Sequence, residues 1–132
     1  MNKTQAQWWV GAITELLTGK DLVTVAIGGL RRSPKVLTGQ RFKEAYIVEY
    51  ADSTCSLGVS DSYGVMSGAE KWEIDANQRM IHAETTNGFG EPLTFLWVVN
   101  VNDGGADYDK WRALMQESWR MNAGEPAKDE PC

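Results

Sequence analysis

The chain has 132 residues and a formal net charge of −5, with 42% hydrophobic and 23% charged residues. This balance fits one globular domain with a sizeable core, and the acidic charge argues against nucleic-acid binding, which needs a basic surface. No stretch has the length of a transmembrane helix or the pattern of a signal peptide, so we expect a cytoplasmic protein without membrane attachment.

Residues that could bind a metal or form disulfides are scarce. The chain has two cysteines, Cys55 and Cys132, and a single histidine, His82. Two distant thiols and one imidazole do not make a zinc site or a disulfide framework, so we predict no metal and no cofactor. Cys55 has no base or cation near it in the sequence, and we expect it to be buried.

A helix is predicted near the start, over residues 5–18. Apolar residues recur every three or four positions from Trp9 to Leu17, which is the pattern of an amphipathic helix. Thr4 and Gln7 have the spacing of a capping box. Gly19 suits the left-handed position that follows the last turn.

The middle of the chain consists of short β-branched and apolar stretches separated by turn residues. The predicted strands are residues 22–27, 36–38, 41–50, 54–60, 70–75, 79–86 and 92–101. Residues 61–68 are predicted to be a loop or a ragged edge strand. Since the connections are too short for a crossover, neighbouring strands should be antiparallel.

The stretch from Pro92 to Val101 is the most hydrophobic of these strands. Phe95 and Trp97 lie on one face at the strand period of two, and Leu96 and Val98 lie on the other. We therefore predict a central strand that is covered on both faces.

The second predicted helix follows Asp107, which can cap it. Its apolar stripe is Tyr108, Trp111, Leu114, Met115 and Trp119. Residues 1–124 should form a single domain, and residues 125–132, which are rich in proline and charge, a disordered tail.

The predicted fold class is α+β. An N-terminal helix precedes an antiparallel meander of six to eight strands, which forms a strongly curved sheet or partly closed barrel with the C-terminal helix packed on it. This order of elements is similar to that of small lipocalin-like folds, and the resemblance implies a concave face that could hold a ligand. The sequence has six tryptophans, which could fill that face as a core or line an open pocket.

One segment has an unusual charge. Between Leu22 and Lys43 there are five basic residues and no acidic residue. Flexible glycines beside arginines could bind an anion through backbone N–H groups and guanidinium forks. The candidate anion-binding residues are Gly28, Gly29, Arg31, Arg32 and Lys35. The alternative is a solvated turn whose arginines pair with the surplus acids.

These observations lead to two hypotheses about function. The first is a non-catalytic binding module that binds a basic protein partner or a small molecule on its curved sheet, with a homodimer also compatible. The second is a small-molecule enzyme with an aromatic-lined pocket, in which His82 or a glutamate transfers protons. The residues proposed for the pocket or core are Trp72, His82, Trp97 and Trp111.

Overall fold

The computed structural model describes residues 1–29, 33–69, 71–100 and 107–121. Helix α1 (Lys3–Leu17) is followed by strands β1 (Asp21–Gly28), β2 (Lys35–Glu49), β3 (Cys55–Asp61), β4 (Val65–Ala69), β5 (Lys71–Asp75), β6 (Met80–Thr86) and β7 (Pro92–Val99), and then by helix α2 (Tyr108–Ser118). The predicted tail, residues 125–132, and Cys132 lie outside the described residues.

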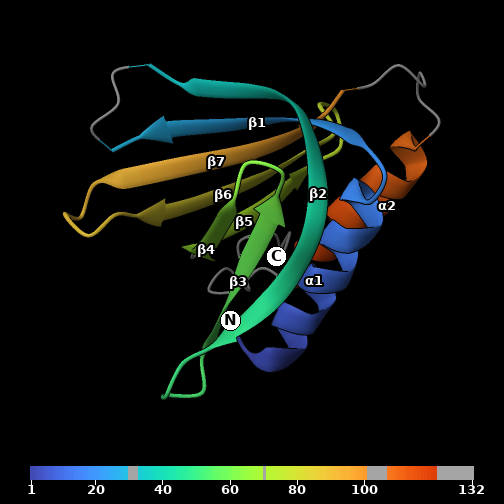
Figure 1. Cartoon of the computed structure of the whole chain (residues 1–132). Helices are drawn as coiled ribbons and strands as arrows, with labels where there is room; N and C mark the ends of the chain where they lie inside the picture. Colours follow the sequence, from blue (N-terminus) through green and yellow to red (C-terminus); the bar gives the residue numbers. More distant parts are fainter. Residues whose placement is uncertain (30–32, 70, 101–106, 122–132) are drawn as a thin grey trace, which may run out of the picture.

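The strands form one antiparallel sheet in the order β4-β3-β2-β1-β7-β6-β5. Strand β7 pairs with β1 along nearly its whole length, from Leu22 opposite Val99 to Gly28 opposite Leu93, and so joins two meanders into a single sheet. The sheet curls into a half-barrel, with α1 packed against its β2–β3 side (Figure 1). The predicted α+β fold, with a helix at each end of a curved antiparallel sheet, is confirmed.

Strand β2 differs from the prediction of two separate strands, 36–38 and 41–50. It is one continuous strand that pairs with β1 through its first half and with β3 through its second half. The pairing register with β1 shifts between Leu22 and Thr24, opposite a stretch of β2 that contains Gly39, whose φ is +67°. A bulge of this kind bends a strand without ending it, so the sheet can turn through β2.

The start of α1 also differs from the prediction. The capping box is formed by Asn2 and Gln5, two residues before the predicted Thr4 and Gln7. The Asn2 Oδ1 accepts from the Gln5 N–H at 2.8 Å, and the Gln5 Oε1 accepts from the Asn2 N–H at 2.9 Å. Gly19 has the expected left-handed conformation, with φ of +78°.

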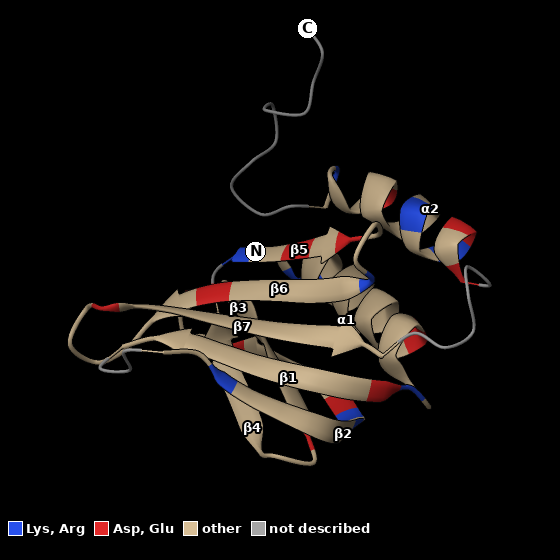
Figure 2. Ribbon diagram, turned by 90° about the horizontal axis from the view of Figure 1, so that it is seen from above, with Lys and Arg blue, Asp and Glu red and all other residues tan. Residues whose placement is uncertain are grey.

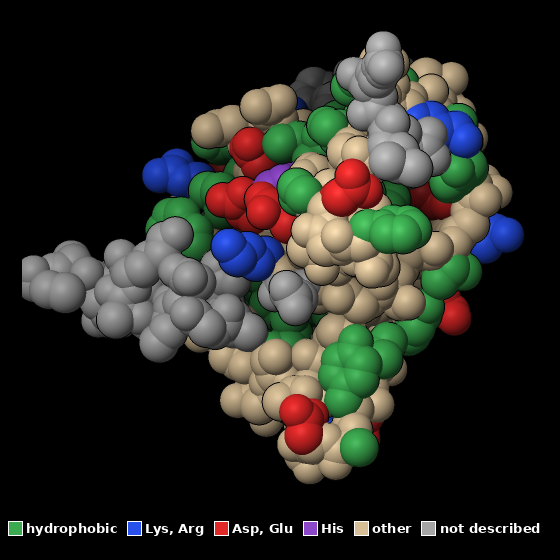
Figure 3. All heavy atoms as spheres, turned by 90° about the vertical axis from the view of Figure 1, so that its left-hand side faces the viewer, with side chains coloured by type: hydrophobic (Ala, Val, Ile, Leu, Met, Phe, Trp, Pro, Cys, Tyr) green, Lys and Arg blue, Asp and Glu red, His purple; other side chains and the backbone are tan. Residues whose placement is uncertain are grey.

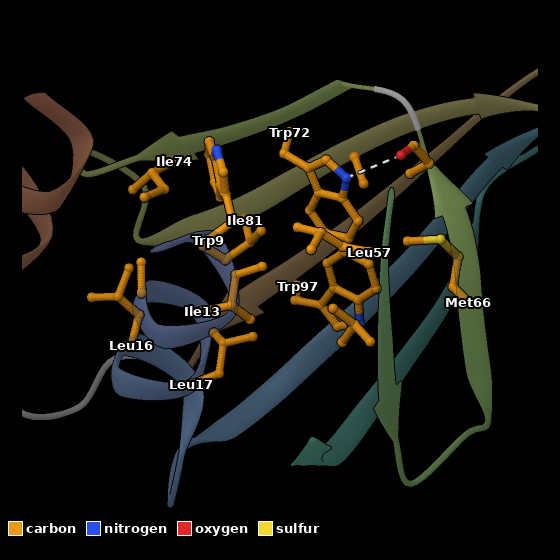
Figure 4. Close-up of a cluster of buried hydrophobic side chains, with 14 of the residues drawn as sticks. Trp9, Ile13, Leu16, Leu17, Leu57, Met66, Trp72, Ile74, Ile81 and Trp97 are labelled. Carbon is orange, nitrogen blue, oxygen red and sulfur yellow. Dashed lines mark hydrogen bonds between the residues drawn. The ribbon is translucent and has the colours of Figure 1, made fainter. Parts of the chain in front are cut away.

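The concave face of the sheet is filled by the hydrophobic core. Side chains of α1, among them Trp9 and Ile13, point toward the sheet and meet residues of β3, β5 and β7 (Figure 4). Trp72 and Trp97 stack with their ring centres 5.9 Å apart and their planes 5° apart. The tryptophans therefore include several that fill the curved face as a core.

Strand β7 is covered on its inner face alone, which corrects the prediction of cover on both faces. Trp97 and Val99 are buried, whereas Leu96 and Val98 on the outer face remain partly exposed. Figure 2 looks onto β6, β7 and β1 from outside, and neither α1 nor α2 lies in front of them.

Helix α2 packs against β5 and α1. Trp111 is 1% exposed, but Trp119 is 44% exposed, so Trp119 does not belong to the buried stripe predicted for this helix. Asp107 precedes the helix as predicted, yet its side chain makes no capping hydrogen bond and instead pairs with Lys20.

The hydrogen bond from Lys20 holds the pKa of Asp107 below its usual value. Because the folded pKa is lowered, the pair contributes stability above the unfolded pKa and loses it as pH falls through the folded value.

Of the helices in the described ranges, neither is long and apolar enough to cross a membrane.

We predict that α2 stabilises the domain mainly through Trp111. Replacing Trp111 with alanine should lower the free energy of unfolding by about 3–5 kcal/mol, because it leaves a large cavity. Trp119→Ala on the same helix is the matched control and should cost far less. Equal losses for both variants in urea-unfolding curves would contradict this account of the helix.

Candidate functional site

Asp61, the last residue of β3, is a buried carboxylate on the inner face of the sheet, 4% exposed. Its Oδ2 accepts from the Thr24 Oγ1 at 2.7 Å and from the Trp97 Nε1 at 3.2 Å. Its Oδ1 accepts from the backbone N–H groups of Tyr63 at 2.9 Å and Gly64 at 3.1 Å. One carboxylate thus connects β3 to β1, to β7 and to the turn before β4.

All four donors to Asp61 are neutral. A carboxylate has about four acceptor positions, so its hydrogen-bonding capacity is filled. No lysine, arginine or histidine within the described ranges forms an ion pair with it. The carboxylate of Asp61 is therefore held by four neutral N–H and O–H groups, and it has no cationic partner among the residues that the structure describes.

A cavity of about 30 Å³ adjoins this carboxylate. Its wall is largely aromatic and apolar, and the side chains that matter for its chemistry are Tyr63, Met66, Phe95 and Trp97. Phe95 stacks on Trp97 with ring centres 6.3 Å apart. Since Tyr63 is 49% exposed and Val65, also in the wall, is 66% exposed, the cavity reaches the surface.

A second, larger hollow of about 330 Å³ lies beside the end of β2 and the start of β3. Its polar side chains are paired with one another or with nearby turns: the Tyr50 and Ser56 hydroxyls are 2.9 Å apart, and the Thr54 hydroxyl donates to Asp52. Cys55 in its wall is 5% exposed, which confirms its predicted burial.

His82 lies on the outer face of β6, away from the core. Its Nδ1 is 3.4 Å from the Glu73 carboxylate and its Nε2 is 3.4 Å from that of Glu84. In Figure 3 the histidine is seen among acidic side chains. Trp72, Trp97 and Trp111 are buried in the core, so the structure brings these three together but leaves His82 outside. Neither hollow described above includes His82 in its wall.

The predicted anion-binding segment is described only in part, because Arg31 and Arg32 lie outside the described residues. At Gly28 a Cβ atom would come within 2.3 Å of the Pro92 carbonyl oxygen, so close strand packing requires glycine there. The Gly29 N–H donates to the same carbonyl. The Lys35 Nζ donates to the Tyr63 hydroxyl at 3.0 Å and lies 4.7 Å from the centre of that ring. Anion binding at this segment stays a prediction.

The outer surface of the sheet carries a group of apolar side chains that sequence analysis missed. We call it the outer apolar face, and it consists of Val23, Val25, Ile27, Val36, Met80, Leu96 and Val98. Cross-strand pairing makes it continuous, since Val25 lies opposite both Val36 and Leu96, and Val98 lies opposite both Val23 and Met80. Val36 is 57% exposed and Ile27 is 38% exposed. The apolar residues on both faces of β1 and β7 are the available signal, which for residues 92–101 predicts burial on both faces instead of an exposed outer face.

Within the described ranges, no group of three or more histidine, cysteine or acidic side chains is placed to hold a metal ion.

Comparison with known proteins identifies no family and gives a weak structural likeness. No protein-family model matches the sequence, and no curated protein matches it. Among solved structures, the Bacillus subtilis YojF protein is similar with a TM-score of 0.46 at 7% identity, over 72% of this chain and 90% of that one. A likeness this weak carries no functional argument, so the function has to follow from the residues of this chain.

We predict that Asp61 is essential to the stability of the curled sheet. Asp61→Ala should lower the free energy of unfolding by about 2–4 kcal/mol, because buried donors on β1, β7 and the β3–β4 turn lose their acceptor. Asp52→Ala, which removes an exposed turn carboxylate, serves as the control and should change stability little. Urea unfolding measures both, and an unchanged midpoint for Asp61→Ala would show that the four hydrogen bonds contribute nothing.

Proposed function

We propose that this protein is a non-catalytic binding module that docks a protein partner on the outer apolar face. The observation that carries the proposal is the continuity of partly exposed valine, isoleucine, leucine and methionine side chains across β2, β1, β7 and β6. Contiguous apolar surface without cover is uncommon on monomeric proteins and is typical of interaction sites.

The inner face of the sheet supports this choice because it is already occupied. Trp72, Trp97 and Ile81 are at most 2% exposed, and α1 closes the half-barrel over them. The cavity beside Asp61 has a volume of only about 30 Å³. Sites for drug-sized molecules usually measure roughly 300–1,000 Å³, so this cavity is too small to serve as one. The hollow beside the end of β2, at about 330 Å³, reaches the lower end of that range, but the hydroxyl groups of Tyr50, Ser56 and Thr54 in its wall are already hydrogen-bonded.

The charges beside the outer apolar face favour a basic partner. On β5 and β6, three acidic residues point to the same side as this face: Glu73, Asp75 and Glu84. The described residues of those two strands include a single lysine, Lys71, so acidic charge is in excess there. By contrast, β7 has no charged residue, and β1 has only Asp21. In Figure 2 the middle parts of β1 and β7 are tan, and a red, acidic segment of β6 lies beside β7. A complementary partner therefore has an apolar surface flanked by lysines or arginines.

A matched pair of synthetic amphipathic helical peptides tests this proposal. The two peptides share the same leucines and carry either lysines or glutamates on the polar face. We predict that the lysine peptide shifts amide NMR signals of β1, β6 and β7, with an affinity that falls as salt is added. The glutamate peptide should shift none of them.

Substitution on the protein side makes the test specific. Val25→Lys, in the middle of the outer apolar face, should weaken binding of the lysine peptide at least tenfold, because it removes apolar contact and adds a charge of the same sign as the peptide. Val65→Lys places the same change on β4, where valine is 66% exposed, and should have a much smaller effect. Equal effects of the two variants would contradict the proposal. A wild-type homodimer that Val25→Lys dissociates would show that the face binds a second copy rather than a basic partner.

A further inference from the structure

The cavity beside Asp61 combines features that recognise a small cation. One wall presents a carboxylate whose four hydrogen bonds come from neutral groups, so its charge has no described ionic partner. Much of the remaining wall is aromatic or thioether surface from Phe95, Trp97 and Met66. Aromatic faces attract cations through their quadrupole, and the attraction grows where water is excluded.

The structure contains an example of this recognition at the mouth of the cavity. The Lys35 ammonium group lies 4.7 Å from the centre of the Tyr63 ring and donates to the Tyr63 hydroxyl at 3.0 Å. Tyr63 forms part of the cavity wall, and its backbone N–H donates to Asp61. The Lys35 ammonium group thus already lies against one aromatic residue of this site, without forming an ion pair with Asp61.

We propose that the cavity binds the ammonium group of a small primary amine. Its volume of about 30 Å³ is roughly twice what one water molecule needs, which limits the ligand to a group of the size of methylammonium. The ammonium group lies close to Asp61 and against the ring of Phe95. Because the four acceptor positions of Asp61 are filled, the carboxylate attracts the cation through its charge, and Trp97 turns its N–H edge rather than its face toward that carboxylate. The Thr24 hydroxyl, which donates to Asp61, keeps lone pairs that can accept from the ligand. This site is separate from the outer apolar face, and neither proposal depends on the other.

The test is an NMR titration of the isotope-labelled protein with methylammonium chloride, with sodium chloride at the same ionic strength as the reference. Tetramethylammonium chloride serves as a cation of equal charge that is too large for the cavity. The reporters are the indole N–H of Trp97 and the amide N–H of Gly64, which both donate to Asp61. We expect saturable shifts of both signals with methylammonium and none with sodium or tetramethylammonium. No saturable shift with methylammonium, or the same shifts with tetramethylammonium, would overturn the proposal.

Two variants locate the site. Asp61→Asn removes the charge but keeps a carbonyl oxygen for Tyr63 and Gly64, and it should weaken methylammonium binding at least tenfold. If this variant does not fold, Lys35→Met tests the proposed site instead, since it changes only a side chain at the mouth of the cavity. Removing that positive charge should strengthen binding about twofold or more by relieving repulsion. Unchanged or weaker binding by Lys35→Met, or unchanged binding by a folded Asp61→Asn, would refute the site.

Discussion

The shape of this protein depends on the buried carboxylate of Asp61. Strand β3 is separated from β1 by β2 in the sheet, and β7 lies one strand further on. Asp61 nevertheless reaches Thr24 on β1 and Trp97 on β7, which is geometrically feasible only if the sheet curls toward its own inner face. The bulge in β2 near Gly39 allows the bend, and the hydrogen bonds to Asp61 hold the two arms of the sheet at that distance. A buried charge with incomplete hydrogen bonding would be costly, so the four donors must all be in place for this arrangement to be stable.

The curl determines which surfaces remain for binding. Once the inner face closes on α1, the aromatic column of Trp72, Trp97 and Phe95 occupies the volume where a ligand-binding barrel would keep an open cavity. Strands β1 and β7 then have their other face turned outward, with the valines and leucine that would be buried in a two-layer sandwich. The functional proposal follows from this difference between the two faces, because one is filled and the other is not.

Much of the fold could be predicted from local patterns. In the predicted strand 70–75, Trp72 and Ile74 alternate with charged residues, and both are buried in β5. The spacing from Trp9 to Leu17 predicts α1. The pairing of β1 with β7 could not be predicted, because it joins residues more than sixty positions apart and leaves no local pattern. For the same reason the sequence predicts only a loop or a ragged edge strand from residue 61 onward, although Asp61 ends β3 and bonds to side chains on two other strands. The two apolar faces of β7 were misinterpreted as burial, since apolar composition alone does not distinguish a covered face from one that awaits a partner.

Hydroxyl-radical footprinting of the isolated protein tests the central claim, that the inner face of the sheet is filled and the outer face is open. Protection factors, normalised to the unfolded chain, should be low for Val36 and Met80 on the outer apolar face and high for Trp72 and Trp97 inside. Trp119, which is 44% exposed, provides a reactive reference of the same residue type as the buried tryptophans. Strong protection of Val36 and Met80 together with rapid oxidation of Trp97 would contradict the account.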